Sequence, residues 1–118
     1  MYSPQLLDHF EHPRNAGELT GAMARVRIEN PACGDILELA ASVHEGKITE
    51  ICFKAKGCVP AMACGSLITE LAAAKSLAEA AAISREEVAE KIGGLPPHSG
   101  HAAQLAVDAL RELLRQVE

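Results

Sequence analysis

Aromatic residues are scarce in this sequence: phenylalanine, tyrosine and tryptophan together make up 3% of it, and tryptophan is absent. A hydrophobic core must therefore be built from alanine, leucine, isoleucine and valine, and such a core is less sharply specified than an aromatic-rich one. The composition, 48% hydrophobic and 23% charged, is that of a globular protein. With 118 residues in total, we expect residues 1–118 to form a single domain.

Other absences narrow the class of protein. There is no excess of positive charge: the net charge is −5, which argues against nucleic acid as a partner because its binders gather lysine and arginine on one face. No hydrophobic run is long enough to span a membrane, and the first residues are amphipathic and acidic, unlike a signal peptide. We find no phosphate-binding glycine loop and no candidate serine triad, so the sequence does not indicate an enzyme.

We therefore expect a cytoplasmic protein. The sequence has four cysteines, and in the cytosol they stay reduced. Reduced cysteines are better interpreted as metal ligands or nucleophiles than as disulfides.

The N-terminal segment predicts a short helix. Ser3 and Pro4 form a helix start signal, and Pro13 ends the helix. Its apolar stripe would consist of Leu6, Leu7 and Phe10.

The next segments predict three strands. Residues 24–29 alternate strictly between apolar and polar side chains, which is typical of a half-buried strand. A second strand follows Asp35, and a hairpin turn is expected at residues 44–47. A third strand would present Thr49, Ile51, Phe53 and Ala55 on one face.

Helices are expected in the rest of the chain. One opens at Pro60 and runs to about Ala74, and two capping-box patterns, starting at Ser76 and Ser84, predict two short helices. A last helix starts near Ser99. Strands followed by helices indicate an α+β fold, a three-stranded antiparallel sheet with helices packed on one face.

Three loop segments carry side chains that can bind a metal. Cys33 and Asp35 lie in the turn NPACGD, Cys58 precedes the Pro60 helix, and His101 opens the last helix. Each has a plain alternative: an incidental cysteine in a turn, a small buried residue at a strand–helix joint, and a surface or capping histidine. Together the four side chains suffice for a four-coordinate metal site, although their spacing is not a knuckle pattern such as CxxC.

The remaining cysteines are weaker candidates for metal ligands. Cys64 follows Cys58 by six residues, which on a helix corresponds to about 9 Å along the axis. The two thiols therefore cannot readily share a metal, and we favour a core role for Cys64. We assign no function to Cys52.

Several motifs resemble one known family. NPACGD, FKAKGC, LITELAAAKSL, LPP and HAAQLAVDAL, in this order, resemble the iron–sulfur cluster assembly scaffolds of the IscU type, which include the N-terminal domain of NifU. The resemblance covers nearly the whole chain and implies a three-stranded antiparallel sheet with helices packed on it. It also implies a bound [2Fe–2S] cluster, or Zn²⁺ when no cluster is present.

The resemblance further implies partners and a ligand set. A cysteine desulfurase would supply sulfur, and apo-proteins would receive the cluster. Matched by motif, the ligands are Cys33, Asp35, Cys58 and His101.

Two departures from the family pattern stand out. Ala102 occupies the position of the family's third cysteine, which is a ligand and a likely sulfur acceptor there. The chaperone-binding stretch reads LPPHS, which weakens the expectation of an Hsp70-type chaperone as a partner.

The main hypothesis is a scaffold or carrier of a labile cluster. The alternatives are a non-assembling zinc-binding adaptor, or a sulfur-relay protein using Cys33 or Cys58, acting with a desulfurase.

Overall fold

A three-stranded sheet and the helices layered on it make up the protein. The computed structural model describes residues 2–31 and 34–117. Its elements are, in chain order, α1 (Pro4–Glu11), β1 (Ala24–Glu29), β2 (Ile36–His44), β3 (Lys47–Lys56), α2 (Val59–Ala72), α3 (Leu77–Ala81), α4 (Arg85–Lys91), the 3-10 helix η1 (Pro97–Ser99) and α5 (Gly100–Arg115). No helix in these two described ranges is long and apolar enough to cross a membrane.

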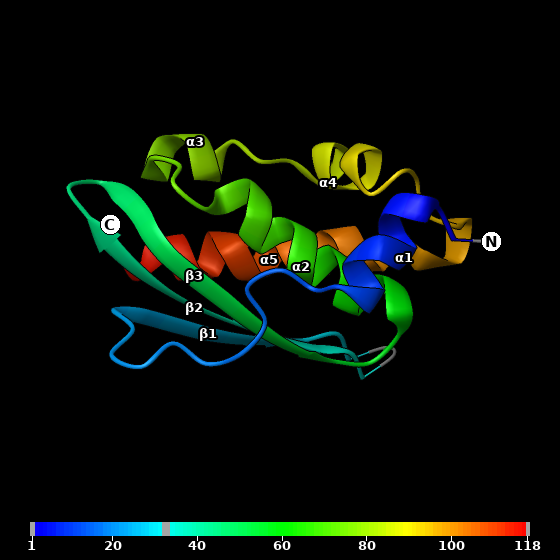
Figure 1. Cartoon of the computed structure of the whole chain (residues 1–118), viewed down its shortest axis with the longest axis horizontal. Coiled ribbons are helices and arrows are strands. Elements are labelled where there is room, and N and C mark those ends of the chain that lie inside the picture. The colour runs from blue at the N-terminus through cyan, green and yellow to red at the C-terminus, as the bar shows by residue number, and fades with distance from the viewer. Residues whose placement is uncertain (1, 32–33, 118) are drawn as a thin grey trace.

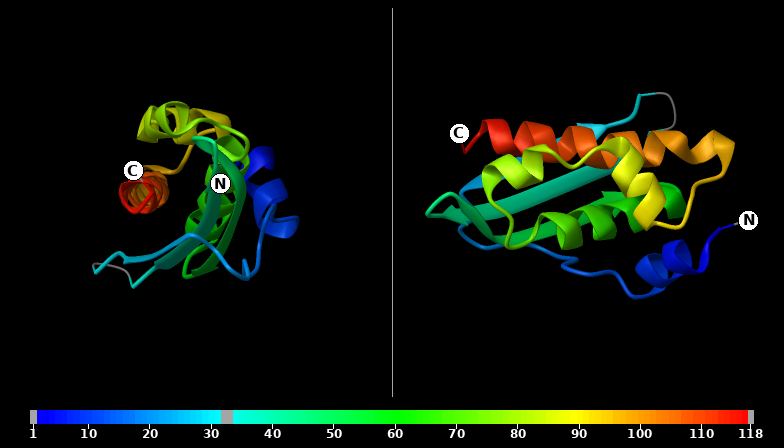
Figure 2. Two further views of the ribbon diagram at one scale, coloured as in Figure 1. Left: turned by 90° about the vertical axis from the view of Figure 1, so that its left-hand side faces the viewer. Right: turned by 90° about the horizontal axis from the view of Figure 1, so that it is seen from above.

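The strands are antiparallel and lie in the order β1-β2-β3. The long helices α2 and α5 cover one face of the sheet, and α3 and α4 lie over those two helices on the side away from the sheet (Figures 1 and 2). Helix α1 packs against α2. The predicted α+β fold, with helices on one face of an antiparallel meander, is confirmed.

Small residues allow α2 to lie close to the sheet. A Cβ atom on Gly65 would stand 3.0 Å from side-chain atoms of both Leu37 and Phe53, so glycine sets the distance between this helix and β2–β3. On α5, Leu105, Ala109 and Leu113 are buried. The core is therefore aliphatic and alanine-rich, as the near absence of aromatic residues requires.

The hairpin between β2 and β3 has the expected turn, with one difference in register. Glu45 and Gly46 both have positive φ, 52° and 76°, as a two-residue type I′ turn requires. A register shift at Ser42/Val43 interrupts the pairing of the two strands. As a result, Ile48 is buried and Thr49 is exposed. The prediction that Thr49 shares a face with Ile51 and Phe53 is wrong because an irregularity of this kind reverses the alternation of the residues beyond it.

The first helix turns a different face inward from the one predicted. Ser3 caps α1 as expected, but Leu7 and Phe10 are 41% and 36% exposed, while Leu6 and His9 are buried. The buried histidine is stabilised by polar partners on α2, which hydrophobic periodicity does not detect.

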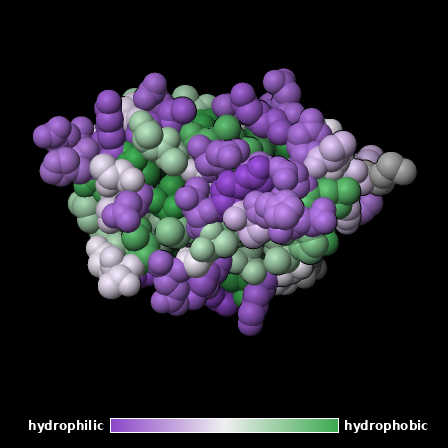
Figure 3. Space-filling view, in the orientation of Figure 1, coloured by the Kyte–Doolittle hydropathy of each residue, from purple (hydrophilic) through white to green (hydrophobic). Residues whose placement is uncertain are grey.

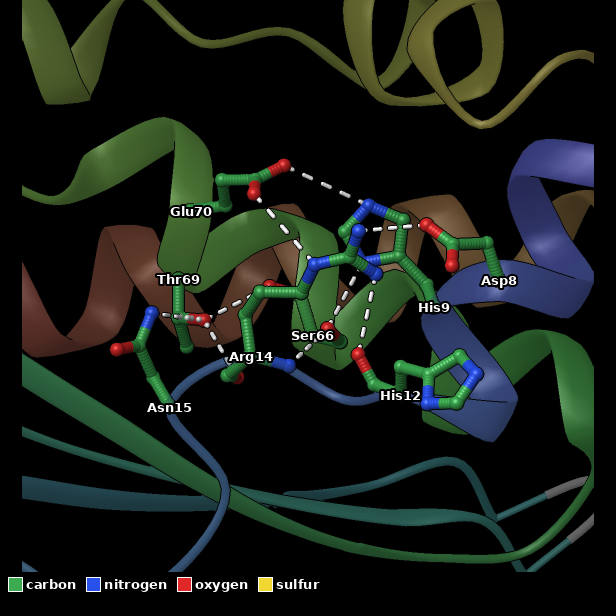
Figure 4. Close-up of polar contacts among 8 residues, drawn as sticks. All are labelled: Asp8, His9, His12, Arg14, Asn15, Ser66, Thr69 and Glu70. Atoms are coloured by element: carbon green, nitrogen blue, oxygen red, sulfur yellow. Dashed lines mark hydrogen bonds and ion pairs between the residues drawn. The ribbon is translucent and has the colours of Figure 1, made fainter.

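Those partners form a polar network between α1 and α2 (Figure 4). His9 Nδ1 lies 2.8 Å from Ser66 Oγ, and the same Oγ accepts a hydrogen bond of 2.8 Å from the Arg14 backbone N–H. The Arg14 guanidinium lies between Asp8, at 2.5 Å, and Glu70, at 3.7 Å. The space-filling view shows hydrophilic residues over the centre of this side of the molecule (Figure 3). The network connects the N-terminal segment to α2, the helix capped by Cys58.

The buried position of His9 predicts a pH dependence of stability. Burial lowers the pKa of His9, and the positive charge of Arg14 lowers it further, against the opposing effect of Glu70 and Asp8. The unfolded chain therefore takes up the proton first, and stability is lost as the pH falls below about 6.5, the pKa of an unperturbed histidine. We expect His9→Gln to lose less unfolding free energy between pH 7.5 and pH 5.5 than the wild type, as measured by urea unfolding. Equal losses in the two proteins would contradict this assignment.

Candidate metal centre

The loop between β1 and β2 holds Asp35 in place. The Gly34 N–H donates to the Asn30 carbonyl at 2.7 Å, and the Asn30 N–H donates to the Asp35 carbonyl at 2.8 Å. These two bonds connect Asn30 with Gly34 and Asp35, and Gly34 has a positive φ of 77°, which glycine adopts without strain. The Asp35 side chain is only 4% exposed, so its carboxylate points into the protein and requires partners there.

Cys58 supplies two of those partners. It is the N-cap residue of α2, directly after β3. Its backbone N–H donates to Asp35 Oδ1 at 3.0 Å, and its thiol lies 3.1 Å from Asp35 Oδ2. The carboxylate therefore lies at the start of α2 and takes one of the N–H groups that a helix start leaves without an intrahelical acceptor.

Gly57 makes this close approach possible. Its φ is +138°, and a Cβ atom there would lie 2.0 Å from Asp35 Oδ1. No side chain can occupy this position while Asp35 stays where it is. Sequence reasoning missed the role of Gly57, although a glycine between a strand and a helix-capping cysteine is a signal for close backbone approach.

His101 reaches the same point from the first turn of α5. Its Nε2 lies 3.3 Å from Asp35 Oδ2 and 3.9 Å from Cys58 Sγ. The His101 side chain is 33% exposed. One side of the cluster is therefore open to an incoming ion or molecule, while Asp35 closes the other side.

The three side chains form a donor set of one oxygen, one sulfur and one nitrogen atom. These atoms all lie within 4.8 Å of one another. A tetrahedral ion with bonds of 2.0–2.3 Å would require neighbouring donors about 3.3–3.8 Å apart, close to the spacing found. Thiolate, imidazole and carboxylate together suit zinc or iron, so the residues present fit a metal of this kind.

The fourth predicted ligand, Cys33, lies outside the described residues. Of the four side chains proposed from the sequence, the structure therefore places three together and does not describe the position of Cys33. Ala102 follows His101 directly, is 1% exposed and belongs to the core cluster.

Cys64 has the core role that helix geometry predicts. It is fully buried within the core cluster. Burial raises the pKa of its thiol to about 12, and the neighbouring Cys58 contributes to the rise. Cys64 is therefore an unreactive thiol. Cys52 is half-buried on the face of β3 opposite to Phe53.

This difference between the thiols can be tested by alkylation. In the native protein at pH 8 we expect iodoacetamide to modify Cys58 well before Cys64, because almost none of the buried thiol is ionised at that pH. Peptide mass spectrometry measures the order of labelling, and labelling in denaturant provides the reference. Cys64→Ala should keep wild-type zinc affinity, and rapid native labelling of Cys64 would contradict the assignment.

The comparisons with known proteins agree with this picture. The model of the NifU-like N-terminal domain family matches residues 1–117. The chain is 41% identical over 114 residues to the iron–sulfur cluster assembly scaffold protein IscU 1 of Archaeoglobus fulgidus, covering 97% of this chain and 74% of that protein. It is 42% identical over 114 residues to the IscU scaffold protein of Haemophilus influenzae, covering 93% and 90% of the two chains.

A solved structure supports the fold independently. The N-terminal NifU-like protein of Brucella abortus superimposes with a TM-score of 0.78 over 98% of this chain and 92% of that one, at 16% identity. The fold and the sequence together place this protein in a class of small α+β scaffold domains. The chain belongs to the NifU-like N-terminal domain family.

Proposed function

We propose that this protein is a scaffold on which a labile [2Fe–2S] cluster is assembled or carried before transfer to apo-proteins. Its ligands would be Cys33, Asp35, Cys58 and His101. The observation that carries the proposal is the convergence of Asp35, Cys58 and His101, from three separate segments, to donor separations within 4.8 Å. The family relationship and the IscU relatives support the same role.

The donor set suits a cluster that is released to an acceptor protein. A carboxylate oxygen is a hard ligand and holds soft cluster iron less tightly than a thiolate does. The backbone N–H of Cys58 also donates a hydrogen bond to Asp35. The carboxylate would keep this hydrogen bond when its bond to the metal breaks. Cys58 and His101 are both partly exposed, which gives an acceptor protein access to the metal side.

The partners follow from the chemistry of the cargo. Sulfur for the cluster would come from a cysteine desulfurase, and apo iron–sulfur proteins would receive the product. The protein would act in the cytoplasm as a scaffold and not as an enzyme, without nucleic acid or membrane as a partner. An Hsp70-type chaperone is not part of the proposal, because the stretch LPPHS departs from the family's chaperone motif.

A second candidate function is a zinc-binding adaptor or sulfur-relay protein that acts with a desulfurase. It is favoured by one observation: the residue after His101 is Ala102, which offers no donor atom. Two cysteines, one histidine and one aspartate form an acceptable zinc site.

Anaerobic reconstitution tests the proposal. The protein is incubated with Fe²⁺, cysteine and a desulfurase, re-isolated, and mixed with an apo-ferredoxin. We expect visible charge-transfer absorption on the protein, which then appears on the ferredoxin. Absorption that forms only on the desulfurase or in free solution would contradict the scaffold role, and a persulfide trapped on Cys33 or Cys58 would favour the relay.

Replacing Asp35 should slow the loss of the cluster. We expect Asp35→Ala to hold its reconstituted cluster several-fold longer than the wild type in the presence of a chelator, because a thiolate from the reconstitution mixture, which binds soft iron more tightly than a carboxylate does, takes the place of Asp35. The decay of the visible absorption measures the rate. Glu112→Ala, on the exposed side of α5, is the control, and unchanged kinetics in Asp35→Ala would refute the role of the carboxylate in release.

A further inference from the structure

A cavity of about 380 Å³ lies directly beside the open side of the metal centre. Its walls come from the end of β1 and the loop after it, the first residue of α4, and the first half of α5. The residues that matter here are Glu29, Asn30, Arg85, His101, Gln104 and Asp108. Because His101 belongs both to the cavity and to the metal centre, a molecule in this cavity can reach the metal position.

The cavity combines charges of both signs with an apolar lining. Arg85 contributes a guanidinium whose Nε contacts Glu86 at 3.2 Å, and the two Nη groups of a guanidinium are further donors that can pair with a carboxylate. Glu29 and Asp108 contribute carboxylates, and Ile28 and Leu105 contribute apolar surface. Gln104 donates to Asp108 at 2.7 Å and fixes the orientation of that carboxylate.

We propose that this cavity binds a free α-amino-acid thiol of the cysteine class. Its carboxylate would pair with Arg85, its ammonium group with Glu29 or Asp108, and its thiol would point toward His101. A cysteine within a polypeptide carries neither charge on its backbone, so the two signs in one cavity favour the free amino acid over a peptide segment.

The role of this ligand rests on the proposed function. When a metal is held at the centre, the thiolate would form a sulfur–metal bond and the His101 nitrogen–metal bond would break. The thiol proton goes to the buffer, and no atom changes its oxidation state. Free cysteine would thus supply the thiolate that Ala102 cannot provide.

Binding to the apo-protein tests the cavity without any metal. We expect L-cysteine and L-serine to shift the backbone amide NMR signals of Gln104 and Leu105 saturably below about 20 mM, a weak affinity of only a few kcal/mol. N-acetyl-L-cysteine amide, which lacks both charges, should bind at least tenfold more weakly. No saturable shift with cysteine, or equal binding of the amide, would overturn the proposal.

Matched variants test the assigned contacts. Arg85→Gln should weaken cysteine binding about fivefold, the upper end of the range for an exposed ion pair, while Arg111→Gln, also an exposed arginine on a helix, should not change it. Equal affinities in wild type and Arg85→Gln would overturn the assignment of the carboxylate. With Co²⁺ bound, cysteine should add sulfur-to-cobalt charge-transfer absorption that serine does not, and its absence would overturn the thiol orientation.

This test is independent of the scaffold proposal. If the protein carries no iron or sulfide but the apo-protein binds cysteine as described, the scaffold role fails and the binding site stands. If a cluster forms but cysteine does not bind to the apo-protein, the scaffold role stands and the proposed binding site fails.

Discussion

Replacing Gly57 with alanine is expected to weaken metal binding strongly, although Gly57 is not itself a ligand. The new Cβ would lie 2.0 Å from Asp35 Oδ1 and 2.6 Å from its Cγ, so the carboxylate must move away. That movement breaks the hydrogen bond from the Cys58 N–H and separates the oxygen donor from Cys58 Sγ and His101 Nε2. We expect zinc affinity, measured by competition with a chelator, to fall by about one to two orders of magnitude, the loss typical when the support of a ligand is removed.

The same substitution should destabilise the protein. A residue other than glycine at this φ costs about 1–3 kcal/mol, and the buried Asp35 carboxylate would also lose the hydrogen bond from the Cys58 N–H. Urea unfolding measures the change in the free energy of unfolding. An alanine variant with wild-type zinc affinity would show that Asp35 does not need its observed position.

Gly21→Ala is the matched control for Gly57→Ala. Gly21 also has a positive φ, +74°, but a Cβ there would have nothing within 4 Å. We expect a loss of about 1 kcal/mol from backbone strain alone and unchanged zinc affinity. If both alanine variants lose zinc binding equally, the loss comes from general destabilisation and not from displacement of Asp35.

Ser66→Ala is expected to give the second large effect, a loss of unfolding free energy of about 2–3 kcal/mol, since a buried polar group without its partner costs about 1–3 kcal/mol. Ser66 is fully buried, and its Oγ contacts both the His9 ring and the Arg14 backbone N–H. Alanine removes the partner of both groups at once. Denaturant unfolding at pH 7.5 measures the difference.

Ser42→Ala serves as the control for this prediction. Ser42 is half-buried on β2, so the same atom is removed away from the α1–α2 network. The backbone of Ser42 lies at the register shift between β2 and β3, but the substitution changes only its side chain, so we expect a change within about 0.5 kcal/mol. Equal effects of the two serine variants would mean that the network contributes little to stability.

Local patterns predict much of this fold. The strict alternation of residues 24–29, the turn around Glu45-Gly46 and the capping pattern at Ser76 depend only on neighbours in the sequence, and all appear in the structure. Features that depend on distant partners do not follow from such patterns. Thr49 is exposed because β2 and β3 shift their register, and His9 is buried because Ser66, 57 residues away, meets its ring.

The candidate site also has some features that the sequence predicts and others that depend on distant partners. The donor character of Asp35, Cys58 and His101 follows from residue type and from their positions at loop ends and helix starts. Their mutual distances do not, since these are set by the packing of α5 and α2 against the sheet. The requirement for Gly57 likewise arises only when a carboxylate from another segment lies against it. The cavity beside His101 has no sequence signature because its walls come from three separate segments.

The most direct test of the central claim is the metal and acid-labile sulfide content of the protein purified without oxygen, together with its visible spectrum. The same analysis is made for Cys33→Ser, Cys58→Ser and His101→Ala. The scaffold proposal predicts iron and sulfide in equal amounts in the wild type and their loss in all three variants. Zinc without sulfide would contradict the scaffold and favour the adaptor, and a wild-type protein with no metal at all would contradict the metal centre itself.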